Sequence, residues 1–234
     1  MKKFILAFIT LFIMTSASLA DSNVYITQSG AALDLDITID GNANAVGASN
    51  DRTLLTGANL DVDIDLIGAT NTITGDFIGT GESGSDDLKI SQTGSTNTTA
   101  LNVGASASTD DVKILETRVG SSGVTSYIIG STATVQDVSV TVDVVGDDID
   151  IALTENSSSS GSDKTTDIDI ATDSDDVDII VTHTGAGAHK TKLLCTGACG
   201  TSDFTFSQTG ANSTDVDLVV TNAAGSDVDI IITD

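Results

Sequence analysis

Hydrophobic and polar residues alternate in short runs along the chain after residue 20. In the run from Asp87, Leu88, Ile90 and Gln92 share one side, because successive side chains of a strand point to opposite faces. The turn-forming stretch Gly94-Ser-Thr-Asn follows, and a second alternating run comes after it. No helical spacing of apolar residues persists in this part of the chain. The pattern predicts an all-β protein made of strand–arc–strand units.

The alternating runs recur at a nearly constant interval. A four-residue phrase, Asp–apolar–x–apolar, opens most of them. Its copies begin at Asp34, Asp61, Asp87, Asp111, Asp137, Asp148, Asp167, Asp176, Asp203, Asp215 and Asp227. The first four steps are 27, 26, 24 and 26 residues, and a fixed period of about 20–50 residues is typical of repeat arrays. We therefore predict a β-solenoid of stacked strand–arc–strand repeats of 24–27 residues, in which each winding completes the core of its neighbours.

The first 20 residues differ from the rest. Lys2 and Lys3 precede an apolar run that is too short to cross a bilayer, and Ser18 and Ala20 are small residues before a cleavage point. This pattern predicts a secretory signal peptide over 1–20, against the alternative of a buried N-terminal helix. Residues 21–234 then form one solenoid domain, secreted or held at the cell surface, with no transmembrane segment.

The composition of residues 21–234 is strongly acidic and poor in large side chains. Loss of two lysines with the first segment leaves seven basic against 34 acidic residues, a formal net charge of −27. A chain of this charge repels nucleic acid, so we expect no nucleic-acid partner. None of the common hydrolase, phosphate-binding or zinc-protease motifs occurs, so we expect no enzymatic activity.

Rows of aspartate are the first candidate site. Alternation places them on the outer face of their strands, where neighbouring windings bring like charges within about 4.8 Å of each other. One interpretation is a solvated face that limits aggregation, and the other is a row bridged by Ca²⁺, which prefers several oxygen ligands. The candidate calcium ligands are Asp61, Asp63, Asp65, Asp176, Asp178, Asp215 and Asp217.

Cys195 and Cys199 are the second candidate. In an exported chain such a pair suggests a disulfide closed by a tight turn between them, with free thiols or a metal site as alternatives. His183 and His189 flank the nearby corner at Gly185, and we expect both to be exposed corner residues.

The spacing at several corners resembles the curlin repeat of bacterial curli fibre subunits, Ser-x5-Gln-x-Gly-x2-Asn. Four corners match parts of this pattern. The first has Ser22, Gln28 and Gly30, and the second keeps only Gly68 and Asn71. The third has Gln92, Gly94 and Asn97, and the fourth has Ser202, Gln208, Gly210 and Asn212. Stacked Gln and Asn side chains can form hydrogen-bonded ladders between windings, whereas the plainer interpretation makes each Gln a polar residue at a strand end. A second Gln late in each curlin repeat has no consistent counterpart here.

The resemblance implies an extracellular amyloid fibre, a pilus-like structure for adhesion or biofilm, with self-association and partners for secretion and nucleation. The run from Asp227 to Asp234 is a strand without a visible cap, and unpaired backbone groups there are expected to template another subunit. The alternative function is a monomeric acidic solenoid that binds Ca²⁺, a surface glycan or another partner.

Overall fold

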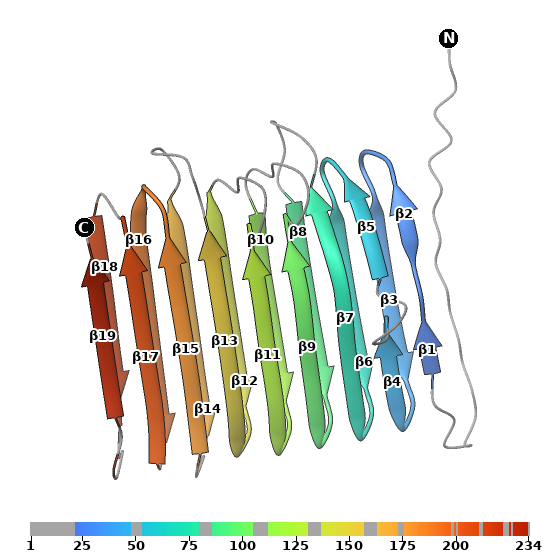
Figure 1. Cartoon of the computed structure of the whole chain (residues 1–234). Coiled ribbons are helices and arrows are strands. Elements are labelled where there is room, and N and C mark those ends of the chain that lie inside the picture. Colours follow the sequence, from blue (N-terminus) through green and yellow to red (C-terminus); the bar gives the residue numbers. More distant parts are fainter. Residues whose placement is uncertain are drawn as a thin grey trace.

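Parallel strands account for all the regular structure in the described part of the chain. The structure, a computed structural model, describes residues 22–47, 53–79, 86–104, 112–130, 137–156, 163–172, 176–197, 199, 201–210, 213–221, 225 and 227–233. Their strands form two sheets, which lie as two layers with the N-terminal strands at one end of the stack and the C-terminal strands at the other (Figure 1). The signal-peptide prediction for 1–20 lies outside the described residues.

The strands divide between the sheets as follows. The eleven-stranded sheet contains β1 (Ser22–Val24), β2 (Thr27–Ser29), β4 (Ala43–Val46), β5 (Thr53–Gly57), β7 (Thr70–Gly79), β9 (Thr96–Val103), β11 (Ser122–Ile129), β13 (Asp148–Asn156), β15 (Asp176–Thr184), β17 (Thr201–Thr209) and β19 (Asp227–Thr233). The eight-stranded sheet contains β3 (Asp34–Asp40), β6 (Asp61–Ile67), β8 (Asp86–Thr93), β10 (Val112–Val119), β12 (Val138–Val145), β14 (Lys164–Thr172), β16 (Ala188–Gly197) and β18 (Ser213–Val220).

From β6 onward the chain alternates strictly between the two sheets, so that each strand pairs with the strand of the same sheet one winding away. The predicted all-β solenoid of stacked repeats is therefore confirmed. Aligned residues are 27 apart at Asp34 and Asp61, 28 apart at Asp148 and Asp176, and 24 apart at Asp203 and Asp227. This spacing agrees closely with the repeat expected from the sequence.

The core lies between the two sheets and is built from one residue in two. β12 is typical, because Val138, Val140, Val142 and Val144 are buried while the residues between them face outward. Opposite and stacked aliphatic side chains of this kind form a single continuous core cluster along the solenoid. A core one side chain deep on each sheet explains why so few aromatic residues are needed to fill it.

The structure corrects one detail of the repeat register. Lys113, and not the predicted Asp111, lies opposite Asp87, so that this step is 26 residues. The shift is two residues, which keeps the same face of the strand inward and leaves the hydrophobic pattern unchanged. A carboxylate column of Asp34, Asp61 and Asp87 therefore ends on a lysine.

A column of glycines turns the chain between the sheets. It contains Gly41, Gly68, Gly94, Gly120 and Gly146. A Cβ atom on Gly94 would overlap the carbonyl oxygen of Gly68, and one on Gly120 would overlap that of Gly94. Glycine is required here because successive arcs lie in direct backbone contact.

Among the described residues, no helix is long and apolar enough to cross a membrane.

Candidate functional site

An asparagine ladder lies inside the arcs at the N-terminal end of the solenoid. Nδ2 of Asn44 donates to Oδ1 of Asn71 at 3.0 Å, and Nδ2 of Asn71 donates to Oδ1 of Asn97 at 2.9 Å. Each amide also donates to a backbone carbonyl of the next winding, such as Thr93 for Asn71 at 3.0 Å. The predicted positions Asn71 and Asn97 are thus brought together, and Asn44 extends the ladder although no curlin spacing marks it.

The glutamines do not stack on one another. Gln92 is fully buried but lies beside Leu66 and Arg118 in its sheet, and its amide contacts Thr98 and Thr99 across the core. Gln208 is also buried and donates across the core to Thr191 at 3.4 Å. The inward positions were predicted, but these two amides connect the sheets within the core instead of forming a ladder along the stack.

The remaining positions of the repeat motif lie at the ends of strands. Gln28 is half-buried on β2, and Gly30 follows that strand. Gly210 follows β17 with φ +76°, a backbone conformation that favours glycine. Asn212 lies outside the described residues.

The Glu116 cluster is a buried polar network in the middle of the solenoid. We define it as Gln92, Thr99, Glu116, Arg118, Thr125 and Tyr127. The Glu116 carboxylate accepts hydrogen bonds from the hydroxyls of Thr99 at 2.9 Å, Thr125 at 3.0 Å and Tyr127 at 2.9 Å. Burial and the Glu116 carboxylate raise the pKa of Tyr127 well above its usual value, so the phenol remains a donor.

Arg118 supplies the positive charge of this cluster. Its Nη1 donates to the Thr125 hydroxyl at 2.8 Å, which in turn donates to Glu116. Burial lowers the pKa of Arg118, and the Glu116 charge opposes that shift. The guanidinium occupies the place where the asparagine ladder would continue, because a Cβ on Gly123 would lie 2.6 Å from the guanidinium carbon. Glycine at this position therefore makes room for the arginine.

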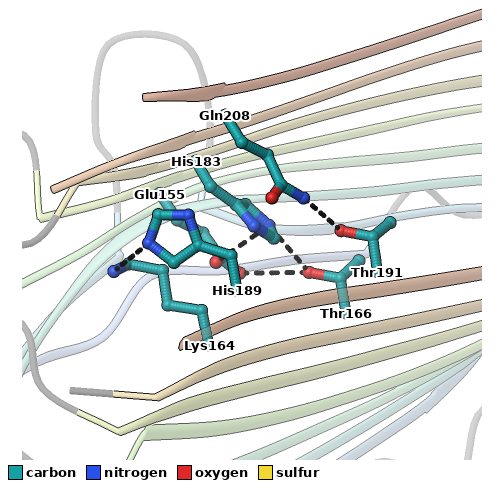
Figure 2. Close-up of polar contacts among 7 residues, drawn as sticks. All are labelled: Glu155, Lys164, Thr166, His183, His189, Thr191 and Gln208. Carbon is teal, nitrogen blue, oxygen red and sulfur yellow. Dashed lines mark hydrogen bonds and ion pairs between the residues drawn. The ribbon is translucent and has the colours of Figure 1, made fainter. Parts of the chain in front are cut away.

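The Glu155 cluster is a second buried polar network, closer to the C-terminal end. We define it as Glu155, Lys164, Thr166, His183, His189, Thr191 and Gln208, which point toward one another from both sheets in Figure 2. Nε2 of His183 lies 3.2 Å from Oε2 of Glu155 and 3.2 Å from the Thr166 hydroxyl. Nζ of Lys164 lies 3.3 Å from Nε2 of His189, and the two imidazole rings meet edge to face.

Burial holds the Glu155 cluster in a weakly charged state. It raises the pKa of Glu155 to about 8, while Lys164 and the Thr166 hydroxyl oppose the shift. Burial together with neighbouring groups lowers the pKa of His183 to about 3 and that of His189 to about 4. Burial therefore favours the uncharged forms of Glu155 and His183 at neutral pH, and their 3.2 Å contact is a close approach of two largely uncharged groups.

The prediction that His183 and His189 are exposed is wrong, because both side chains are fully buried. His183 continues the inward positions of β15 after Val181, and His189 occupies an inward position of β16. The same period-two pattern also places Glu116 and Arg118 inward after Ile114. Extending the alternation through these polar residues would have located both clusters from the sequence.

The aspartates lie on the outside as predicted, in columns that run along the stack. Asp178 stacks between Asp150 and Asp203, and Asp61 stacks between Asp34 and Asp87. Partial burial raises the pKa of Asp61 and of Asp178, and nearby carboxylates add to the shift, Asp63 most strongly for Asp61 and Asp176 for Asp178.

The other predicted ligands have different neighbours. Asp63 forms an ion pair with Lys89, whose Nζ lies 3.4 Å from Oδ2 of Asp63. Asp65 lies between Thr38 and Ser91 of the neighbouring strands. Asp176 is aligned with Asp148 and Thr201. Asp215 and Asp217 lie opposite Lys190 and Lys192. Within the described ranges no three acidic, histidine or cysteine side chains are arranged to hold a metal ion.

Cys195 and Cys199 form a disulfide. Cys195 occupies an inward position near the end of β16, and both cysteines are fully buried. The bond joins the end of β16 to the connection that leads to β17. Of the three alternatives that the sequence left open, the structure contains the disulfide.

An apolar surface is exposed at β19. The residues Val228, Ile230 and Ile232 are aligned with the buried positions Phe204, Phe206 and Gln208 of β17. Ile230 nevertheless remains 48% exposed, because among the described strands β19 pairs only with β17. The strand thus presents core-type side chains and one unpaired backbone edge to solvent.

The arrangement defines a class of protein: a parallel β-solenoid with an acidic exterior, internal polar clusters and, among the described strands, an exposed edge strand at β19. No family model, curated protein or solved structure matches the chain.

Proposed function

We propose that this protein is a secreted structural subunit that adds end to end into curli-like fibres at a cell surface. The observation that carries the proposal is the exposed core face of β19. An edge strand that leaves backbone donors and acceptors unpaired is a template for strand addition. Continuing the stack with a second copy would bury Val228, Ile230 and Ile232 and satisfy that edge.

The strand count constrains how two copies would join. The described path of the eleven-stranded sheet begins at β1 and ends at β19, whereas that of the eight-stranded sheet begins at β3 and ends at β18. If β1 of one copy were placed directly on β19 of another, the smaller sheet would lack one strand between β18 and β3. If β19 instead replaces β1 and β2 of the next copy, both sheets continue without a gap.

The first strands are suited to such replacement. β1 and β2 have three residues each, and among the described strands β1 pairs only with β4 and β2 only with β5. β19 has seven residues and an uninterrupted alternation. The exchange therefore substitutes a longer strand for two short ones.

The columns of stacked aspartates make assembly depend on the charge of their carboxylates. Stacked carboxylates repel one another, and two unit charges about 4 Å apart interact by roughly 1 kcal/mol in water and roughly 4 kcal/mol at an effective dielectric constant of 20. A monomeric solenoid that binds calcium through these columns is the competing function, but the described residues do not cluster as metal ligands. The fibre proposal therefore takes precedence.

The test is a matched pair of substitutions in β19. Ile230→Asn places a polar group on the inward face, whereas Ile231→Asn alters the neighbouring outward residue, which is 55% exposed. We expect purified residues 21–234 and Ile231→Asn to form fibres that bind thioflavin, and Ile230→Asn to remain monomeric. Equal behaviour of the two variants, or a wild-type protein that stays monomeric with and without calcium, would contradict the proposal.

A deletion separates strand exchange from direct contact. Removal of residues 22–29, which include β1 and β2, leaves the β4 and β5 edges open. Strand exchange predicts that this variant still elongates and does so faster than the full chain. Direct stacking of β1 on β19 predicts that it does not elongate.

A further inference from the structure

The Glu116 cluster contains the parts of a reactive centre. We propose that Thr99 and Gln92 join in an intramolecular ester bond, formed by the folded protein without a cofactor. The Thr99 hydroxyl oxygen lies 2.9 Å from Oε1 of Glu116 and 3.2 Å from Oε1 of Gln92. A nucleophile, a carboxylate and a carboxamide thus meet in a site that is closed to water.

Thr99 is the nucleophile of this centre. A hydroxyl becomes nucleophilic when an adjacent base removes its proton, and a base within hydrogen-bond reach satisfies the geometric requirement. Glu116 meets that requirement from the neighbouring winding, where Thr125 and Tyr127 also donate to it and hold its carboxylate in place.

Gln92 is the acyl group. Its Nε2 donates to the backbone oxygen of Thr98 at 3.3 Å, which fixes the plane of the amide. Its Oε1 faces Thr99, so the nucleophile lies beside the carboxamide. Attack on the amide carbon places negative charge on Oε1, and that charge requires a donor.

Arg118 is placed to supply this donor. It is the in-register neighbour of Gln92 on the adjacent winding, and its Nη2 is buried without a hydrogen-bond partner. A buried unpaired donor of a charged group is costly and needs an explanation. Stabilisation of the oxyanion on Gln92 provides one, because the guanidinium would gain its missing acceptor when the tetrahedral intermediate forms.

The reaction is balanced within the chain. Glu116 takes the proton of Thr99 while the hydroxyl oxygen bonds to the amide carbon of Gln92. Collapse of the intermediate breaks the carbon–nitrogen bond, and Glu116 returns the proton to the departing nitrogen, which leaves as ammonia. The product is an ester between residues 92 and 99, and no oxidant, reductant or other reactant is consumed.

The bond would join the two sheets within one winding. Gln92 is on β8 and Thr99 is on β9, so the ester closes the arc that contains Gly94. This arc could then not open without breaking a covalent bond. The link lies far along the sequence from the disulfide at Cys195 and would restrain a different winding.

The pair Thr191 and Gln208 is an internal control. Nε2 of Gln208 lies 3.4 Å from the Thr191 hydroxyl, so a threonine and a glutamine again meet in the core. Within the described part of the chain, Thr191 has no hydrogen bond to a carboxylate. We therefore expect one ester per chain and no reaction at Thr191.

Intact-mass spectrometry of reduced residues 21–234 tests the proposal. The expected mass is lower than that of the sequence by one molecule of ammonia. Trypsin releases both residues in one peptide, residues 90–113, since cleavage follows Lys89 and Lys113. Fragmentation of this peptide should give no ions from cleavage between Gln92 and Thr99, and alkaline hydrolysis should convert residue 92 to glutamate.

Variants assign the roles. Thr99→Ser should retain the loss of ammonia, whereas Thr99→Val and Glu116→Gln should have the unmodified mass, and Thr191→Val should match the wild type. An unmodified wild-type mass would overturn the proposal even if a variant fails to fold, as would an ammonia loss that maps to an asparagine. Retention of the loss in Glu116→Gln would overturn the role of the base. These masses are independent of fibre formation, so either proposal can fail alone.

Discussion

The Glu116 and Glu155 clusters place a glutamate in the same thin core but stabilise it in different ways. Glu116 has three hydroxyl donors and the charge of Arg118 nearby. Glu155 has one hydroxyl donor, at 3.4 Å, and its cluster contains unpartnered atoms on His183, His189 and Gln208. In the first cluster three hydroxyls and Arg118 surround the carboxylate, whereas in the second burial favours the uncharged forms of Glu155, His183 and His189.

The difference shows what a solenoid core of this width tolerates. A buried carboxyl group is stabilised by hydrogen bonds where several donors and a cation converge on it, and burial raises its pKa where few donors reach it, as at Glu155. Each winding contributes only a few inward side chains, so the outcome depends on the residues of two or three neighbouring windings.

Loss of the cation from each cluster should give the largest contrast. Arg118→Met leaves the Glu116 carboxylate without its counter-charge, and we expect a loss of about 3–5 kcal/mol in the free energy of unfolding. Lys164→Met removes a cation whose pKa is already lowered by burial, and we expect a change of less than about 1 kcal/mol. Urea denaturation of freshly purified protein measures both, and equal losses would remove the distinction between the clusters.

Breaking the uncharged asparagine ladder should lower the free energy of unfolding by less than the loss of Arg118 does. Asn71→Ala leaves its partners on Asn44, Asn97 and the Thr93 carbonyl unsatisfied, with an expected loss of about 1–3 kcal/mol. Asn44→Ala should cost less, because Asn44 has a ladder partner on one side only and its Oδ1 is unpaired. A larger loss for Asn44 in the same urea titration would contradict the ladder.

The pH dependence of stability between pH 6.5 and 8 should report the ionisation of Glu155. Its folded pKa of about 8 exceeds the ordinary value of 4.5, so the folded state holds one more proton between these limits, and stability falls as pH rises through them. His183, with a folded pKa of about 3, opposes this trend only below its ordinary value of 6.5. Between pH 6.5 and 8, the wild type should therefore lose about 1–2 kcal/mol relative to Glu155→Gln. Parallel stability curves over this range would show that Glu155 is already ionised.

The smallest effect is expected on the exterior. Lys89 lies 3.4 Å from Asp63, but the side chains are 59% and 46% exposed. Water and salt screen such a pair, so Lys89→Ala should change the unfolding free energy by about 0.2–1 kcal/mol. A loss comparable to that of Arg118→Met would mean that the outer columns, and not the internal clusters, dominate the electrostatics.

The sequence was sufficient for the fold because every strand obeys one rule, the alternation of inward and outward residues. Leu88 and Ile90 face the core, and Asp61 faces solvent, as that rule requires. The glycine and asparagine corners were also predictable, since close stacking of arcs excludes larger residues at Gly68 and Gly94.

The clusters escape a prediction from residue type, because polar residues occupy inward positions in them. His183 was placed at a corner as a polar residue, although its position continues the inward face of β15. The contacts of Thr99 with Gln92 and Glu116 depend on the exact register of neighbouring windings, and that register differs by two residues from the one indicated by the aspartate phrase. Period predicts the face on which a residue lies, but pairings across the core require the coordinates.

Electron microscopy of purified residues 21–234, with helical reconstruction of any fibres, tests the central claim most directly. The account predicts fibres in which the strands lie perpendicular to the long axis, with β19 of one copy in the place of β1 and β2 of the next. Isolated solenoids at every concentration, or fibres that leave the β19 edge exposed, would contradict it.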